Sequence, residues 1–226
     1  MFLVRIVRGN LATHRADAIV NSANPSLSGA FNTSYWRFNG RRSVDGALHE
    51  AAGQDALRSL SAEAMRAASL QLLLPGQTLV TPPSGRLVQT TKLIIHTVAP
   101  DGLYGAGVSD DQLALLKTSY AVAMATAEEH GATSVAIPAI GVGVNGWHPA
   151  VAARQALNCA LDRARAAPTD GSLRRIDFVL KSDSVWSVWQ ACATKLLGKA
   201  IEPVPDTASD VDSVCWSFPL AANHTQ

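Results

Sequence analysis

An aspartate and a histidine, Asp45 and His49, stand four residues apart in the stretch SVDGALHEAAG. This spacing places both side chains on one face of a helix. Ser43 can cap that helix, so that Asp45 falls in its first turn, where the helix dipole favours an ionised carboxylate. An ionised carboxylate among small residues can hold a water molecule or a sugar hydroxyl. In isolation, however, the pattern fits an ordinary pair on the surface of a helix better.

Two further stretches could bind a ligand where a strand ends. Asn24 closes the apolar run DAIVNSAN, and its amide can make two hydrogen bonds to a sugar, although an Asx turn before Pro25 explains the same residue. The run GVGVNG, at 141–146, precedes a helix opened by Pro149. Its backbone N–H groups could cradle a phosphate, or the run could be a plain strand-to-helix turn. By contrast, His96 lies in a strongly apolar run and is expected to be a hydrogen-bonded core histidine.

The elements that must position these residues alternate between strand and helix. Apolar runs predict strands at 2–9, 17–24, 76–81, 92–100, 133–140 and 174–182. Helical periodicity and capping residues predict helices at 44–66, 109–130, 149–166 and 184–199. Such alternation predicts an α/β protein, a three-layer α/β/α sandwich with a central mixed, mostly parallel sheet. Because ligands bind at the carboxyl ends of strands in open α/β sheets, the stretches described above should meet there.

Composition indicates one intracellular domain. The chain has 226 residues, 47% of them hydrophobic, and we expect a domain over residues 1–200 with a tail over 201–226 that is disordered or packed back on it. A net charge of +1 gives no strong signal for nucleic acid. The sequence shows neither a signal peptide nor an apolar run of membrane length, and its three cysteines have no zinc spacing. We therefore expect a cytoplasmic or nuclear monomer without a metal site.

The order of the motifs is more specific than any one of them. The stretches RGNLATHRADAIVNSANPSLSG, VDGALHEAAG, IIHTVAP and AIPAIGVGVNGWHPAVAA follow one another as in the macrodomain family. The chain resembles that family over roughly residues 2–198. The resemblance implies a three-layer α/β/α fold that binds ADP-ribose in a cleft at the strand ends. It implies ADP-ribose as the ligand, with no cofactor required.

The resemblance also implies a role for particular residues. Asn24 would orient the distal ribose, Asp45 would position a water beside the anomeric carbon, and His49 would support the site. Asn10 stands where the family has an aspartate that recognises the adenine amino group. The ligand-binding positions implied in this way are Asn10, Leu11, Ala23, Gly46, Val98, Ala99, Pro100, Gly141, Val142, Gly143, Val144, Asn145 and Gly146.

The stretch VDGALH resembles the family branch that removes ADP-ribose from proteins. We therefore expect an ADP-ribosyl hydrolase that acts on mono-ADP-ribosylated protein or on O-acetyl-ADP-ribose. Two alternatives stay open: a non-catalytic module that binds ADP-ribose or ADP-ribosylated protein, and a phosphatase acting on ADP-ribose 1''-phosphate.

The sequence departs from the family pattern in two places. The segment 31–42, which contains three arginines that could meet phosphate, replaces a run of glycines before VDG. Asn145 replaces the aromatic residue that usually packs against the distal ribose, and Trp147, Tyr35 or Trp36 could take over that contact. Both changes fall at the reactive end of the expected ligand.

Overall fold

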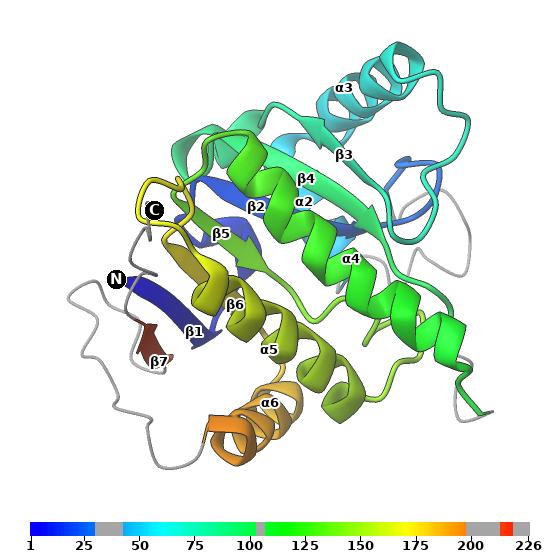
Figure 1. Ribbon diagram of the computed structural model, residues 1–226. Coiled ribbons are helices and arrows are strands. Elements are labelled where there is room, and N and C mark those ends of the chain that lie inside the picture. The colour runs from blue at the N-terminus through cyan, green and yellow to red at the C-terminus, as the bar shows by residue number, and fades with distance from the viewer. Residues whose placement is uncertain (30–42, 103–106, 198–212, 219–226) are drawn as a thin grey trace, which may run out of the picture.

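One mixed β-sheet forms the centre of the molecule. The computed structural model describes residues 1–29, 43–102, 107–197 and 213–218. In these ranges the strands form a seven-stranded sheet in the order β3-β4-β2-β5-β6-β1-β7 (Figure 1). The strands are β1 Phe2–Arg8, β2 Ala18–Ala23, β3 Thr78–Thr81, β4 Leu93–Val98, β5 Ser134–Ile137, β6 Arg175–Leu180 and β7 Ser213–Phe218.

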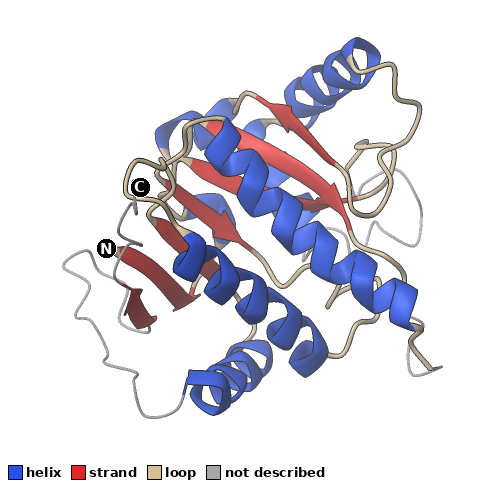
Figure 2. Ribbon diagram, in the orientation of Figure 1, coloured by secondary structure: helices blue, strands red, loops and turns tan. Residues whose placement is uncertain are grey.

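Helices cover both faces of this sheet (Figures 1 and 2). The α-helices are α2 Val44–Ala52, α3 Gln54–Ala67, α4 Asp110–Glu129, α5 Pro149–Ala166 and α6 Asp183–Leu197, and the short 3-10 helices are η1 Leu11–Thr13 and η3 Gly85–Gln89. Helices α4, α5 and α6 share the larger hydrophobic core with one face of the sheet. Helices α2, α3 and η1 share a second core with the other face. The predicted three-layer α/β/α sandwich is therefore confirmed.

The direction of the strands brings the candidate residues together at the carboxyl ends of the parallel strands. Strands β4, β2, β5, β6 and β1 are parallel to one another, and the outer strands β3 and β7 are antiparallel to β4 and β1. Parallel strands end at the same side of a sheet. The segments that follow β2, β4, β5 and β6 therefore come together, although they are far apart in the sequence.

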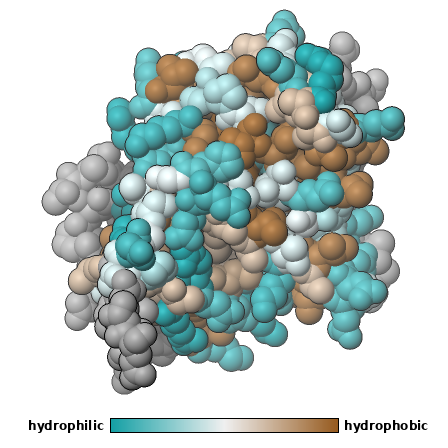
Figure 3. All heavy atoms as spheres, turned by 45° about the horizontal axis from the view of Figure 1, so that its top comes forward, coloured by the Kyte–Doolittle hydropathy of each residue, from teal (hydrophilic) through white to brown (hydrophobic). Residues whose placement is uncertain are grey.

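The larger core is built around aromatic side chains. Tyr120 of α4, Phe178 of β6 and Trp189 of α6 are all buried, and the rings of Phe178 and Trp189 lie 5.0 Å apart between centroids. Burying an aromatic side chain of this size contributes roughly 1.5–3 kcal/mol. The exposed surface is mixed, with hydrophobic and hydrophilic side chains interspersed on the face drawn in Figure 3.

A buried ion cluster joins β1, β6 and the segment after η1. Asp177 is fully buried and accepts hydrogen bonds from Arg5 Nε at 2.6 Å and Arg5 Nη2 at 2.8 Å. Oδ2, which accepts from Arg5 Nη2, also lies 2.8 Å from His14 Nε2 and 3.0 Å from Arg175 Nε. The register of the parallel strands places Arg5 opposite Asp177, so the sheet itself positions the pair.

The structure differs from the predicted helix at 44–66. That segment forms two helices, α2 and α3, which meet at Gly53. Gly53 has a φ of 81°, a backbone conformation that favours glycine over residues with a side chain. The break turns the chain, so α2 can lie against β2 while α3 contacts β3.

Part of the predicted tail belongs to the sheet. Residues 213–218 form β7, an edge strand that pairs antiparallel with β1 from Phe2 to Val7. Val214, Cys215 and Trp216 are buried there. The domain boundary at residue 200 stays a prediction.

Candidate functional site

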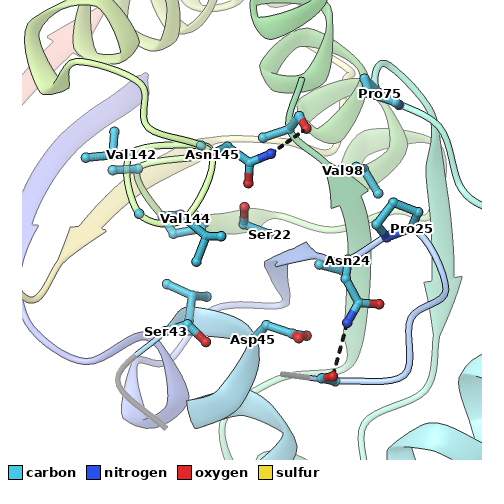
Figure 4. Close-up of a pocket in the computed structure, with 18 of the residues that line it drawn as sticks. Ser22, Asn24, Pro25, Ser43, Asp45, Pro75, Val98, Val142, Val144 and Asn145 are labelled. Atoms are coloured by element: carbon cyan, nitrogen blue, oxygen red, sulfur yellow. Dashed lines mark hydrogen bonds between the residues drawn. The ribbon is translucent and has the colours of Figure 1, made fainter. Parts of the chain in front are cut away.

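A cleft of about 770 Å³ opens at the carboxyl ends of the parallel strands (Figure 4). Its size is in the range typical of sites for small molecules and cofactors. The segment after β2, the start of α2, the segment after β4, the loop after β5 and the end of β6 all contribute to its wall. The predicted residues that line it are Ala23, Asn24, Asp45, Val98, Ala99, Gly141, Val142, Gly143, Val144 and Asn145.

Six other predicted residues are not part of the cleft lining: Asn10, Leu11, Gly46, His49, Pro100 and Gly146. Leu11 is buried in the second core, and the Asn10 side chain caps η1 by accepting a hydrogen bond from the Ala12 amide at 3.1 Å. The carbonyl of Pro100 accepts a hydrogen bond from Trp147 Nε1 at 2.7 Å. These contacts give structural roles to positions for which the sequence suggests ligand contacts.

Asp45 lies at the wall of the cleft in the first turn of α2. Ser43 caps this helix, as predicted, by accepting a hydrogen bond from the Gly46 amide at 3.0 Å. Asp45 Oδ1 accepts a hydrogen bond from Asn21 Nδ2 at 2.8 Å and lies 3.5 Å from His49 Nε2. The predicted pairing of Asp45 with His49 on one helix face is thus confirmed, but both side chains are buried rather than displayed on the surface.

Burial governs the charge state of this pair. It raises the pKa of the Asp45 carboxyl, and His49, Asn21 and the guanidinium of Arg58 oppose that rise without cancelling it. Burial also lowers the pKa of His49, against the opposing effect of the Asp45 charge. A carboxylate with a raised pKa is a stronger base than an exposed aspartate. The site therefore holds a basic carboxylate beside a largely neutral imidazole.

Asn21 and His96 lie behind Asp45. The amide nitrogen Asn21 Nδ2 is 3.2 Å from His96 Nδ1, and His96 Nε2 is 2.9 Å from Thr81 Oγ1. All of these side chains are buried. His96 is therefore a hydrogen-bonded core histidine, as predicted. Sequence reasoning missed Asn21, although an asparagine within an apolar strand was a usable signal that a buried polar partner lies nearby.

Asn24 both lines the cleft and organises the loop that follows β2. Its Oδ1 accepts hydrogen bonds from the Ser28 amide and from Ser26 Oγ, both at 3.1 Å. Its Nδ2 donates to the carbonyl of Gly29 at 3.1 Å, a bond drawn in Figure 4. The turn that the sequence offered as an alternative is therefore present. In Figure 4 Asn24 and Asp45 extend into the same part of the cleft.

Two contacts hold the loop after Asn24 against α2 and α3. Arg58 Nε donates a hydrogen bond to the carbonyl of Ser28 at 2.7 Å. Gly29 has a φ of 79°, and a Cβ at this position would lie 3.0 Å from ring atoms of His49. A larger residue could not keep this backbone in place, so Gly29 allows the loop to pack directly on the imidazole.

The glycine-rich loop after β5 forms the opposite wall. Gly141 has a φ of 80°, and a Cβ there would lie 2.6 Å from Trp147 Cδ1. Asn145 Nδ2 donates a hydrogen bond to the backbone carbonyl of Ala99 at 3.1 Å. The backbone carbonyl of Asn145 accepts one from the Gly102 amide at 2.6 Å. These bonds fix the loop to the segment after β4, with Val144 and Asn145 at the cleft (Figure 4).

The sequence offers Trp147, Tyr35 and Trp36 as replacements for the aromatic residue that packs against the distal ribose. Trp147 is buried in the larger core and does not line the cleft, so it cannot take over that contact. Tyr35 and Trp36 lie outside the described residues, as do the three arginines of the segment 31–42. Residues at the end of β6 and directly after it also line the cleft, including Lys181 and Ser182. Sequence reasoning missed them.

The described residues contain no group of three or more His, Cys, Asp and Glu side chains that could hold a metal ion. In the same ranges, none of the helices is both long enough and apolar enough to cross a membrane.

Known proteins resemble this chain over most of its length. A family model described as Macro domain matches residues 20–156. A macro domain-containing protein of Streptomyces griseus is 35% identical over 178 residues, which are 79% of this chain and 87% of that protein. An O-acetyl-ADP-ribose deacetylase of Citrobacter rodentium is 31% identical over 194 residues, 85% of this chain and 96% of that protein. A mutant of the Oceanobacillus iheyensis macrodomain with ADPR has a TM-score of 0.70 and 27% identity, covering 87% of this chain and 94% of that one.

Proposed function

This chain belongs to the macro domain family, and from that premise we propose that it binds ADP-ribose in the cleft and hydrolyses ADP-ribosyl linkages. The proposed substrates are mono-ADP-ribosylated protein and O-acetyl-ADP-ribose. One observation carries the hydrolytic part of the proposal: a buried carboxylate, Asp45, stands at the wall of the cleft beside the ribose-side residue Asn24. The relative named as a deacetylase supports it.

The walls of the cleft suit the parts of the proposed ligand. Backbone N–H groups of the loop Gly141–Asn145 would hold the diphosphate, since such loops present several donors to one anion. The amide of Asn24 would meet the distal ribose, which would place the anomeric carbon near Asp45. The adenosine end would lie against the end of β4, where Val98 and Ala99 form the wall.

Asp45 would act as a general base in this arrangement. It accepts a proton from a water molecule while the water oxygen bonds to the anomeric carbon. The bond from that carbon to the leaving oxygen breaks, its electron pair stays on the oxygen, and the oxygen takes up the proton that Asp45 accepted, which returns Asp45 to the ionised form. Burial raises the pKa of Asp45, which increases its basicity in the ionised form. Turnover should therefore rise with pH through the raised pKa of Asp45.

The variant Asp45→Ala tests this function. It should lower turnover of mono-ADP-ribosylated protein and of O-acetyl-ADP-ribose by a factor of about 100 or more, the usual contribution of a general base. ADP-ribose affinity, measured by calorimetry, should change little. Glu63→Ala is the matched control, because it removes an exposed acidic side chain from α3.

Two results would contradict the proposal. If the unaltered chain binds ADP-ribose tightly but releases no ADP-ribose from modified protein, it is a reader module. Undiminished turnover by Asp45→Ala would remove this carboxylate from the mechanism. ADP-ribose 1''-phosphate belongs in the same assay as a third substrate, since phosphate release from it alone would indicate a phosphatase.

A further inference from the structure

A line of buried polar side chains runs from the edge of the sheet to Asp45. It starts at Thr81 on β3, continues through His96 on β4 and Asn21 on β2, and ends at the Asp45 carboxylate on α2. Asn21 and His96 are direct partners in the strand register, and His96 pairs with Leu79, the residue two before Thr81. Among these side chains only Asp45 lines the cleft.

The distances determine where the proton of His96 lies. Asn21 Nδ2 carries two hydrogens, and its two near neighbours are Asp45 Oδ1 at 2.8 Å and His96 Nδ1 at 3.2 Å. Because an amide nitrogen can only donate, His96 Nδ1 must accept and therefore carries no proton. The proton of the neutral ring is then on Nε2, which faces Thr81 Oγ1 at 2.9 Å. Burial lowers the pKa of His96 to about 3, so the ring is neutral at ordinary pH.

The orientation of the Asn21 amide depends on that tautomer. Among the described residues, Asn21 Oδ1 has no hydrogen-bond partner, so no contact on its oxygen side holds the amide in place. If His96 carried its proton on Nδ1, that N–H would face the Asn21 N–H groups. The amide would then turn over and direct its oxygen at the Asp45 carboxylate, which would replace a hydrogen bond by repulsion.

We propose that Thr81 and His96 are positioning residues for Asp45. The Thr81 hydroxyl stabilises the Nε2–H form of His96, and this tautomer keeps the Asn21 amide oriented so that it donates a hydrogen bond to the carboxylate. The inference rests on the proposed function, in which Asp45 is the general base. It extends the machinery of the site to the edge strand β3, outside the cleft.

Other charged and titratable groups also face these side chains. His49 of α2 and Arg58 of α3 act on Asp45, and the ring of His49 lies near enough to His96 to influence its pKa. These groups are unchanged when Thr81 is replaced, so a change in Asp45 on replacing Thr81 reports on the hydrogen-bonded line.

The test replaces the hydroxyl while keeping the shape. Thr81→Val removes the acceptor for His96 Nε2–H, and the matched control Thr81→Ser retains it. Nitrogen NMR of the imidazole should show the Nε2–H form of His96 in the unaltered protein and in Thr81→Ser, and a substantial Nδ1–H fraction in Thr81→Val. Carbon NMR of the Asp45 carboxyl should show a higher pKa in Thr81→Val, because the carboxylate loses the donor that opposes the effect of burial.

Kinetics give the functional readout. At a pH below the pKa of Asp45, Thr81→Val should lower kcat about tenfold with little change in KM, because losing one hydrogen bond raises that pKa and leaves about a tenth as much of the carboxyl ionised. The acid limb of its pH–rate profile should move to higher pH, and Thr81→Ser should restore both. If valine at this position prevents folding, as judged by circular dichroism, Thr81→Ala carries the same expectations.

The inference is overturned if the variant lacking the hydroxyl keeps His96 in the Nε2–H form and keeps the unaltered Asp45 pKa and kcat. The proposed function fails separately, if the unaltered chain hydrolyses no ADP-ribosyl substrate. In that case the two NMR measurements still decide whether Thr81 sets the tautomer of His96 and the pKa of Asp45.

Discussion

The buried ion cluster on β6 allows a quantitative prediction about stability. Burial by itself raises the pKa of Asp177, but hydrogen bonds from Arg5 and His14 and the charge of Arg175 outweigh it and lower the pKa from 3.8 to about 2. Because the pKa is lower in the folded state, the carboxylate contributes stability that is present above about pH 4 and is lost as the pH falls toward about 2. The difference of about 1.8 between the two pKa values corresponds to about 2.4 kcal/mol.

The variant Asp177→Asn should lose more than this near pH 7. An asparagine cannot ionise, and it leaves the guanidinium groups of Arg5 and Arg175 without a counter-charge in a largely buried place. Breaking a buried pair in this way costs about 3–5 kcal/mol. The expected fall in the free energy of unfolding is therefore in that range.

Urea unfolding followed by circular dichroism measures the loss. The deficit of Asp177→Asn relative to the unaltered protein should shrink by about 1 kcal/mol near pH 3, because the unfolded carboxyl is then mostly protonated and folding must release its proton. Asp170→Asn, at an exposed position, is the control and should change little. Equal stability of Asp177→Asn and the unaltered protein near pH 7, or a deficit independent of pH, would refute the reasoning.

Three other outcomes are expected. Asp45→Asn should raise Tm near pH 8 and change it little near pH 4. Burial raises the pKa of Asp45, so the unaltered fold loses stability as the pH rises through that pKa. A lower Tm of the variant near pH 8 would contradict this. Gly141→Ala should lower Tm, since its Cβ would meet Trp147 at 2.6 Å, whereas Gly143→Ala, where a Cβ meets nothing within 4 Å, should leave Tm nearly unchanged. Arg58→Gln should move the acid limb of turnover to higher pH, because the cation opposes the rise in the pKa of Asp45; an unmoved limb in kinetic profiles would exclude that influence.

Local patterns in the sequence were sufficient for most of the architecture. The helix at 109–130 has a capping serine, periodic apolar residues and a terminal glycine, and α4 occupies Asp110–Glu129. The break between α2 and α3 was missed because alanine and leucine on both sides of Gly53 continue a helical pattern. The positive φ at that glycine separates the two helices.

The candidate site was predictable only in part. Asp45, Asn24 and the loop Gly141–Asn145 carry signals within short stretches, and the structure brings them to one cleft. The contacts of Asn21 and Thr81 connect residues 15 or more positions apart, and no local pattern encodes such pairings. The placement of Trp147 in the core likewise depends on a hydrogen bond to Pro100, 47 positions away.

The position of β1 in the sheet has a consequence for the order of events during synthesis. Its two neighbours are β6, which begins at Arg175, and β7, which begins at Ser213. Strand β1 therefore leaves the ribosome long before either partner is synthesised. Phe2, for example, pairs with Phe218. Pairings between such distant residues close late and slow the folding of a domain. A nascent chain that lacks β6 and β7 exposes β1 without either of its partners in the sheet, and unpaired strands of this kind are prone to aggregate.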